Sequence, residues 1–290
     1  MTSTATLDSE AERIVKDIGI PPCPTILTNL VREMRHDEPD FRRVGELISG
    51  DVGLSASLLK TVNSPFYGLR TKATTIQQAL ALLGLEKVAN LVTGLLLRQA
   101  FPHSNSAAME GFWDSSSRVA ALSAEFAGKL GGVDTDVAYT FGLFRDCGMP
   151  VLAAHFKDYD AILTGKALGP GDIVTAIEAE RYGVTHAGIG YSLASSWFLA
   201  DSLCEAVQNH HEYGLWPRRG TGASVSVGAN AGSGPLGAIA LAAEHISVRR
   251  QGGKAAREWV HGGAAVLNAL GLSLSRFEEI VASIEQGKSR

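Results

Sequence analysis

Apolar residues in the first third of the chain recur with the 3.6-residue period of α-helices. Pro21, Pro22 and Pro24 fix a turn that can lead into the first of these helices. A second helix is expected over residues 42–49, and a third after Asp51, whose carboxylate can cap it. The buried stripe of the first helix is predicted to consist of Ile26, Leu27, Leu30, Val31 and Met34.

A capping box marks the next helix, because Thr75 is followed three residues later by Gln78. This helix should end at Gly84, and a new one should begin at Leu85. The pair resembles a DNA-binding helix-turn-helix in outline, but its second helix lacks the basic exposed face that recognition needs. A wide apolar arc predicts that the second helix is buried on several sides; it contains Val88, Leu91, Val92, Leu95 and Leu96.

Helical spacing continues in the remainder of the chain, without an alternating strand pattern of useful length. Residues 219–234 are rich in Gly, Ser and Ala and predict a loop, which lacks the Gly-Lys-Ser/Thr ending of a P-loop. We therefore predict an all-α fold of two fused helical lobes, residues 1–105 and 106–290, with the Gly/Ser-rich loop near 219–235. Helices of the second lobe are expected over 112–130, 139–156, 173–182, 187–199, 236–249, 255–270 and 274–286.

Composition indicates a soluble globular protein, with 45% hydrophobic residues, 19% charged residues and a net charge of −4. This charge gives no general attraction for nucleic acid. No signal peptide is recognisable, and the most apolar window, residues 91–97, is shorter than the roughly 20 residues that cross a bilayer. Cys23, Cys147 and Cys204 are far apart, as expected for buried thiols in the cytoplasm.

Several motifs in order closely resemble the HDOD family, the HD-related output domains of bacteria. The resemblance covers roughly residues 18–213. The motifs are Pro-Pro-Cys-Pro at 21–24, Asp-Val-Gly-Leu-Ser-Ala-Ser-Leu-Leu at 51–59, Asn-Ser-Pro-Phe-Tyr-Gly at 63–68 and Ile-Gln-Gln-Ala-Leu-Ala-Leu-Leu-Gly-Leu at 76–85.

The resemblance implies an all-helical fold whose second lobe is a degenerate relative of the HD metal-dependent phosphohydrolases. It also implies a signalling role through contacts with other signalling proteins, without a cofactor. The identity of those partners stays open. Wide apolar arcs on the helices around Leu91 and Ala255 could support a homodimer.

Active HD enzymes hold metal with a first His, an adjacent His-Asp and a distant Asp. The resemblance places Ser115 at the first position, Arg145 and Asp146 at the doublet, and Glu244 near the last. Two imidazoles are then missing, so we predict a vestigial site without metal or catalysis. We expect Arg145 to pair with Asp146 or Glu244, to take the place of the metal charge and to hold the old site shut.

Histidines His186, His210 and His211 keep two alternatives open. His186 and His210, together with Asp146 and Glu244, could form an altered metal site in a phosphohydrolase or phosphodiesterase. Alternatively, the old pocket could bind a nucleotide or another anion near Arg145 and His186 as a sensor. The simpler interpretation is that these imidazoles pack at helix ends, hydrogen-bonded to backbone or carboxylate groups.

The turn that contains Asn63, Ser64 and Tyr67 carries the most recognisable motif of the resemblance. Asn and Ser side chains commonly satisfy backbone groups in tight turns, so a structural role is expected. Phe66 and Tyr67 would pack beneath the turn. An interaction surface for a partner protein is the alternative.

Overall fold

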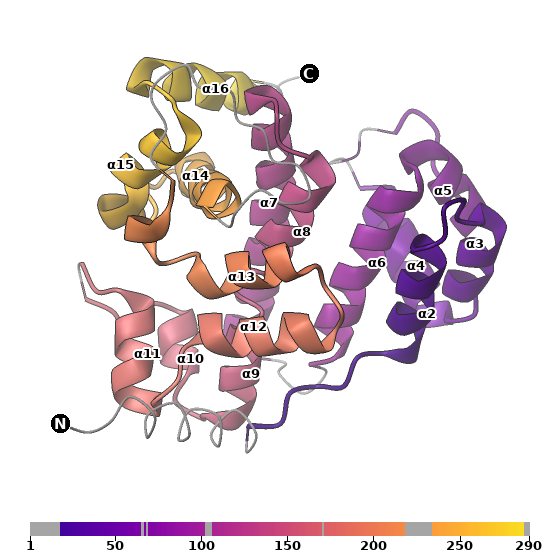
Figure 1. The fold of residues 1–290 in the computed structure, drawn as a ribbon, viewed down its shortest axis with the longest axis horizontal. Coiled ribbons are helices and arrows are strands. Elements are labelled where there is room, and N and C mark those ends of the chain that lie inside the picture. The colour runs from indigo at the N-terminus through magenta and orange to yellow at the C-terminus, as the bar shows by residue number, and fades with distance from the viewer. Residues whose placement is uncertain are drawn as a thin grey trace. The chain divides into compact units, whose positions relative to one another are not determined.

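The computed structural model describes residues 18–64, 67, 69–101, 106–169, 171–217 and 234–286. Every regular element in these residues is a helix (Figure 1), which confirms the predicted all-α class. The chain divides into two compact units. The smaller unit is Pro21–Pro102 with Ser196–Phe198, and the larger unit contains the remainder.

The smaller unit is built around α6, which packs against α2, α4 and α5. Leu91, Val92 and Leu96 on α6 are buried inside this unit, so the apolar arc of α6 is already covered within one chain. This removes the basis for a homodimer through Leu91, although a homodimer by another surface stays a prediction. The helices of this unit are α2 (Thr25–Met34), α3 (Phe41–Ser49), α4 (Val52–Val62), α5 (Ile76–Leu83) and α6 (Leu85–Gln99).

Two predicted helix caps are present in the smaller unit. The Asp51 carboxylate accepts a hydrogen bond of 2.9 Å from the backbone N–H of Leu54. The Thr75 hydroxyl accepts one of 3.1 Å from the N–H of Gln78. The return bond of the capping box differs from the usual one, because Gln78 accepts from the N–H of Thr74 rather than from that of Thr75.

The side chain of Asn63 joins the end of α4 to the segment before α5. Its Nδ2 donates to the carbonyl of Ala73 and its Oδ1 accepts from the Ala73 N–H, each at 2.8 Å. Both polar atoms of the Asn63 amide are therefore hydrogen-bonded inside the unit, which supports a structural role. An interaction surface at Ser64 and Tyr67 stays a prediction. Phe66, also expected beneath this turn, lies outside the described residues.

Replacing Asn63 should test this structural role. Asn63→Ala removes both bonds and leaves the Ala73 backbone groups without partners, so the free energy of unfolding should fall by about 1–3 kcal/mol. Ser64→Ala is the matched control, because no described hydrogen bond involves its hydroxyl. Urea denaturation measures both, and equal losses in the two variants would contradict the assignment.

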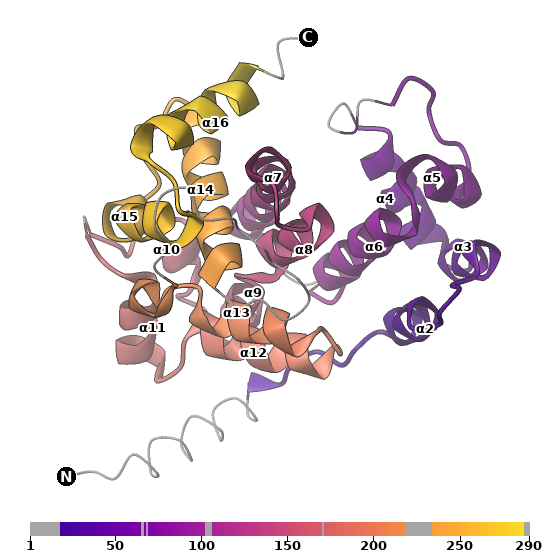
Figure 2. The ribbon, with the colours of Figure 1, turned by 45° about the horizontal axis from the view of Figure 1, so that its top comes forward.

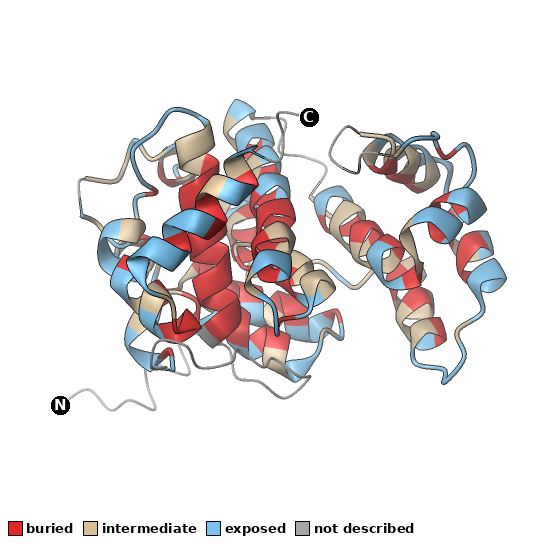
Figure 3. Ribbon diagram, turned by 90° about the horizontal axis from the view of Figure 1, so that it is seen from above, coloured by how far each residue is buried: buried red, intermediate tan, exposed pale blue. Residues whose placement is uncertain are grey.

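The larger unit is centred on α7, which packs against α8, α14 and α16 (Figures 1 and 2). Buried residues gather in the interior of each unit (Figure 3). The helices of the larger unit are α7 (Ala107–Leu130), α8 (Thr135–Phe144), α9 (Gly148–His155), α10 (Asp160–Leu163), α11 (Val174–Tyr182), α12 (His186–Ser196), α13 (Asp201–Asn209), the 3₁₀ turn η1 (Tyr213–Leu215), α14 (Gly234–Arg250), α15 (Trp259–Leu270) and α16 (Leu274–Gln286).

The helix predicted over 139–156 is interrupted between α8 and α9. Pro150 explains the break, because its ring would clash with the carbonyl of Asp146 in a continuous helix and it has no N–H to donate. Other boundaries differ by a few residues: α12 ends at Ser196, and α15 begins at Trp259 rather than at residue 255. Helices α10 and α13 were not predicted.

Most of the predicted loop at 219–235 and the segment after residue 286 lie outside the described residues. None of the described helices has both the length and the apolar character to cross a bilayer.

Two glycines allow α9 and α12 to cross at unusually close range. A Cβ at Gly148 would lie only 2.0 Å from the backbone oxygen of His186, and a Cβ at Gly190 would lie 3.3 Å from the sulfur of Cys147 and 3.4 Å from the backbone nitrogen of Gly148. The thiol of Cys147 donates to the carbonyl of Gly190 at the same crossing, at 3.6 Å. This contact fixes the start of α12 against the break that follows α8.

A side chain at position 148 should force these helices apart. We expect Gly148→Ala to lower the free energy of unfolding by about 1–3 kcal/mol, as overpacking does. Gly111→Ala, on an exposed face of α7 with no atom near its Cβ, is the control and should be neutral or stabilising by up to about 1 kcal/mol. Thermal or urea unfolding measures the stability of both variants. If Gly148→Ala were as stable as the parent protein, α9 and α12 could move apart without loss of stability, and the prediction would be wrong.

Candidate functional site

Arg145 and Asp146 lie at the break between α8 and α9. Arg145 Nη2 is 3.0 Å from Asp146 Oδ2, and Arg145 Nη1 is 3.1 Å from Glu244 Oε2 on α14. The expected pairing is therefore present, and with both acids rather than with one. Burial lowers the pKa of the guanidinium, but the two carboxylates more than offset this and raise it, so Arg145 remains charged.

Three imidazoles converge on the other oxygen of Asp146. His186 begins α12, His210 follows α13, and His211 is the next residue. The His186 Nε2 lies 3.4 Å from the Nε2 of His210 and 2.9 Å from that of His211. Asp146 Oδ1 is 3.2 Å from His210 Nε2 and 3.6 Å from His186 Nε2. These four residues, called here the histidine–aspartate cluster, place their ligating atoms within 4.8 Å of one another.

The Nδ1 atoms of two of these imidazoles are already engaged on the side away from the cluster. His186 Nδ1 is 2.7 Å from Glu178 Oε2, and His210 Nδ1 is 2.6 Å from the carbonyl of Val207. A proton on each Nδ1 leaves the Nε2 lone pair directed into the cluster. His211 Nδ1 lies 2.8 Å from Glu258 Oε2, but this contact is not aligned as a hydrogen bond.

Glu178 is a fully buried carboxylate that sequence reasoning missed. It accepts hydrogen bonds from the backbone N–H of His186 at 2.8 Å and from the hydroxyl of Tyr159. Burial opposes its charge, but His186 and these bonds lower its pKa. A sequence signal for its burial existed, because Glu178 follows the apolar Val174 by four residues and so lies on the same, buried face of α11.

Glu258, just before α15, is a second missed carboxylate. Tyr213 donates a hydrogen bond of 2.5 Å to it. Burial raises the pKa of Glu258, but the contacts from His211 and Tyr213 outweigh it and bring the pKa to about 2. Glu244 behaves in the opposite way, because burial and the neighbouring carboxylates raise its pKa despite Arg145.

The two inner histidines are shifted in opposite directions. Burial disfavours the charge on His186, but Glu178 and Asp146 overcome this and raise its pKa. Burial and the charge of His211 lower the pKa of His210 to about 4, despite its contact with Asp146. Of these two imidazoles, His186 is therefore the better placed to carry a proton.

Charge in this region is not balanced by Arg145 alone. Four carboxylates share this region with one guanidinium. Asp146 and Glu244 pair with Arg145, while Glu178 and Glu258 contact His186 and His211. Three negative charges remain uncompensated when the histidines are neutral, which is costly in a buried environment. Protons on the imidazoles or a bound cation would offset this cost.

The residues present fit a divalent metal ion. A tetrahedral ion with bonds of about 2.0–2.1 Å keeps its ligands about 3.3 Å apart. Four of the six spacings among the ligating atoms, 2.9–3.6 Å, bracket that value, and all six are within 4.8 Å. Asp146, His186, His210 and His211 would hold the ion, while Glu178 and the Val207 carbonyl would orient two of the imidazoles. Such an ion supplies Lewis acidity toward a phosphoryl oxygen or a bound water.

This geometry corrects one premise of the sequence analysis. Two imidazoles are missing from the HD pattern, yet three others supply a set of donors, so the count of ligands is not too small. The predicted absence of a metal stays a prediction. Ser115 is half-buried on α7 and makes no described hydrogen bond or ion pair with these residues, so the structure gives it no part in the cluster.

The lowered pKa of His210 predicts how stability depends on pH. An imidazole held neutral in the fold contributes stability above its ordinary pKa of 6.5, and this contribution is lost as pH falls toward about 4. Compared with His210→Gln, the parent protein should therefore gain roughly 3 kcal/mol of unfolding free energy between pH 4 and 6.5, and no more above that.

Urea denaturation in chelator at each pH measures the difference between parent and variant. The exposed His261→Gln is the control, and its difference from the parent should stay small throughout. A difference that shrinks between pH 4 and 6.5 would show that His210 is charged in the folded protein.

The described residues have the all-helical fold that the resemblance to the HDOD family implied. The sequence model of the HDOD domain matches residues 20–213. The chain therefore belongs to the HDOD domain family.

Relatives of known sequence are distant and longer. An uncharacterized protein of Treponema pallidum (strain Nichols) is 25% identical over 197 residues, which is 66% of this chain and 37% of that protein. Uncharacterized protein YuxH of Bacillus subtilis (strain 168) is 39% identical over 59 residues, 20% of this chain and 14% of its own length. The chain thus spans well under half of each.

Solved structures share the fold. An HDOD domain protein of unknown function from Geobacter sulfurreducens has a TM-score of 0.70 at 18% identity, covering 97% of this chain and 96% of that one. A Shewanella amazonensis SB2B protein, provisionally named a phosphohydrolase, has a TM-score of 0.68 at 22% identity, covering 98% and 97%. A protein of Marinobacter aquaeolei VT8, provisionally named a signal transduction protein, has a TM-score of 0.70 at 18% identity. The match covers 99% of this chain and 66% of that one.

Proposed function

We propose that this chain is a non-catalytic regulatory module of signal transduction that acts through contacts with other proteins, in the cytoplasm. The observation that carries the proposal is the position of Arg145. Its guanidinium pairs with Asp146 and Glu244 together. A fixed cation thus stands among the carboxylates, at the position where the resemblance places a metal-binding imidazole of the HD enzymes.

The remaining donors also favour a structural over a catalytic role. Asp146 gives one oxygen to Arg145, so one oxygen and three imidazole nitrogens are left. Four protein donors close the shell of a tetrahedral ion, whereas catalytic zinc sites keep one position open for water or substrate. Side-chain exposure of the four donors is at most 15%, at Asp146, which leaves a substrate little access.

A metal-dependent phosphohydrolase or phosphodiesterase is the second candidate. It is favoured by the converging Nε2 atoms and by the uncompensated negative charge around them. A six-coordinate ion at the same four donors would keep two positions open. Arg145 would then exchange a carboxylate for a substrate phosphate. A third role, a sensor of a nucleotide or other anion near Arg145 and His186, would use the same guanidinium without turnover.

Metal titration combined with a hydrolysis assay separates these roles. Chelator-treated full-length protein is titrated calorimetrically with manganese, zinc and iron(II), and each loaded form is assayed with bis(p-nitrophenyl) phosphate. We expect no metal-dependent hydrolysis, whether or not an ion binds. Arg145→His, which removes a cation and adds an imidazole, should raise metal affinity at least tenfold.

Two further variants interpret a positive result. Hydrolysis that requires metal and is lost in Asp146→Asn, but kept in the exposed control Asp114→Asn, would overturn the proposal and establish the enzyme. A rise in thermal stability with AMP that Arg145→Met abolishes, without hydrolysis, would instead establish the sensor.

A further inference from the structure

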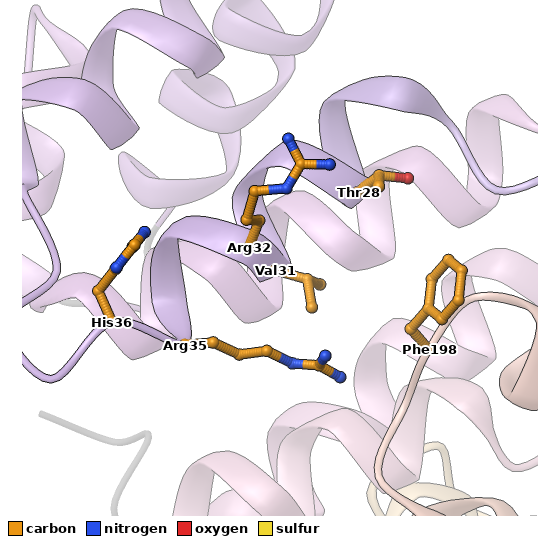
Figure 4. A pocket seen from close by; sticks show the side chains of 6 residues that line it. All are labelled: Thr28, Val31, Arg32, Arg35, His36 and Phe198. Atoms are coloured by element: carbon orange, nitrogen blue, oxygen red, sulfur yellow. The ribbon is translucent and has the colours of Figure 1, made fainter.

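One face of α2 away from the core combines polar, basic and apolar side chains. Thr28, Val31, Arg32 and Arg35 follow the spacing i, i+3, i+4 and i+7, while Leu27 and Leu30 are buried. With His36 and Phe198 these four residues line a cavity of about 410 Å³ (Figure 4). All six residues belong to the smaller unit, and none takes part in the histidine–aspartate cluster.

The basic side chains of this cavity have no partners among the described residues. Arg32, Arg35 and His36 form no side-chain ion pair or hydrogen bond with any described residue. By contrast, the nearby Arg42 and Arg43 pair with acids, Glu46 at 2.9 Å and Glu33 at 3.1 Å. One cation at the end of α2 is explained by the helix dipole, but a dipole does not require two unpaired arginines and an imidazole around one cavity.

Phe198 has a left-handed backbone conformation that is unfavourable for a residue with a side chain. Its φ is +61°, in the left-handed region, and the Leu199 N–H donates to the carbonyl of Ala194 at 3.1 Å. This is the helix-terminating arrangement in which glycine is usual. Phe198 is nevertheless 55% exposed, so burial does not offset the strain. The neighbouring Trp197 is buried and donates to the carbonyl of Pro21 at 3.0 Å, which fixes the position of this turn.

We propose that this cavity binds a small anion that carries an aromatic ring, of the nucleotide class. Guanidinium groups bind phosphate through paired hydrogen bonds, and Arg35 extends along the cavity toward Phe198 (Figure 4). An exposed phenyl ring offers a face on which a base can stack. The volume lies within the range of about 300–1,000 Å³ that is typical of small-molecule sites.

Calorimetric titration of the full chain tests this site. The probes are AMP, GMP and ADP, with inorganic phosphate and adenosine as the two half-ligands. At least one nucleotide should bind at least tenfold more tightly than either half-ligand. Arg35→Ala should weaken that binding at least tenfold. Arg70→Ala, which removes an exposed arginine of the same unit that does not line the cavity, should leave it unchanged.

Phe198→Gly separates a binding role from a structural one. Relief of the left-handed strain should raise the melting temperature, while loss of the stacking surface should weaken nucleotide binding at least fivefold. The proposal is overturned by absence of nucleotide binding at millimolar concentration, by equal affinity for inorganic phosphate, or by binding that neither Arg35→Ala nor Phe198→Gly weakens. Binding of a Glu-rich peptide in place of nucleotides would also overturn it. Because no residue is shared with the cluster, neither result bears on the regulatory proposal.

Discussion

The contact between Gly148 and the backbone of His186 is the constraint on which the site depends. At this crossing α9 and α12 approach so closely that no side chain fits. Asp146 lies two residues before one partner, and the imidazole belongs to the other. Backbone packing therefore fixes the chain positions of the carboxylate and the histidine, while Arg145 and Glu178 orient their side chains.

Asp146 divides the site into two halves and also couples them. One of its oxygens contacts Arg145, and the other faces His210 and His186. Electron density drawn toward the guanidinium is less available to a cation among the imidazoles. The pairing with Arg145 therefore weakens the very ligand that a metal would need, while Glu178 strengthens His186 from behind. The balance between these two effects sets the affinity of the cluster for any cation.

Much of the fold follows from local sequence, but the site does so only in part. Helical periodicity and the caps at Asp51 and Thr75 involve neighbours within one turn, so the sequence suffices to predict them. The pairing of Arg145 with Asp146 or Glu244 was predicted from its charge together with the positions that the resemblance assigned to these residues. Glu178 and Glu258 could not be assigned, because only tertiary packing brings them to the histidines.

Some predicted helix boundaries were also wrong, for reasons that lie in the local sequence. The break before α9 was predictable from Pro150, whose effect four residues upstream was overlooked. Helix α13 is short and largely polar on its exposed side, so its apolar residues, Leu203, Cys204, Ala206 and Val207, gave a weak signal.

A guanidinium attached to the chain differs from a bound ion in one further respect. An ion comes and goes with its free concentration, so a site that relies on it changes with metal supply and with chelation. Arg145 is present in every copy of the protein, at every metal concentration. The Arg145–Glu244 ion pair, which joins the end of α8 to α14, therefore does not depend on metal supply, and it would also form in a cell with little free metal.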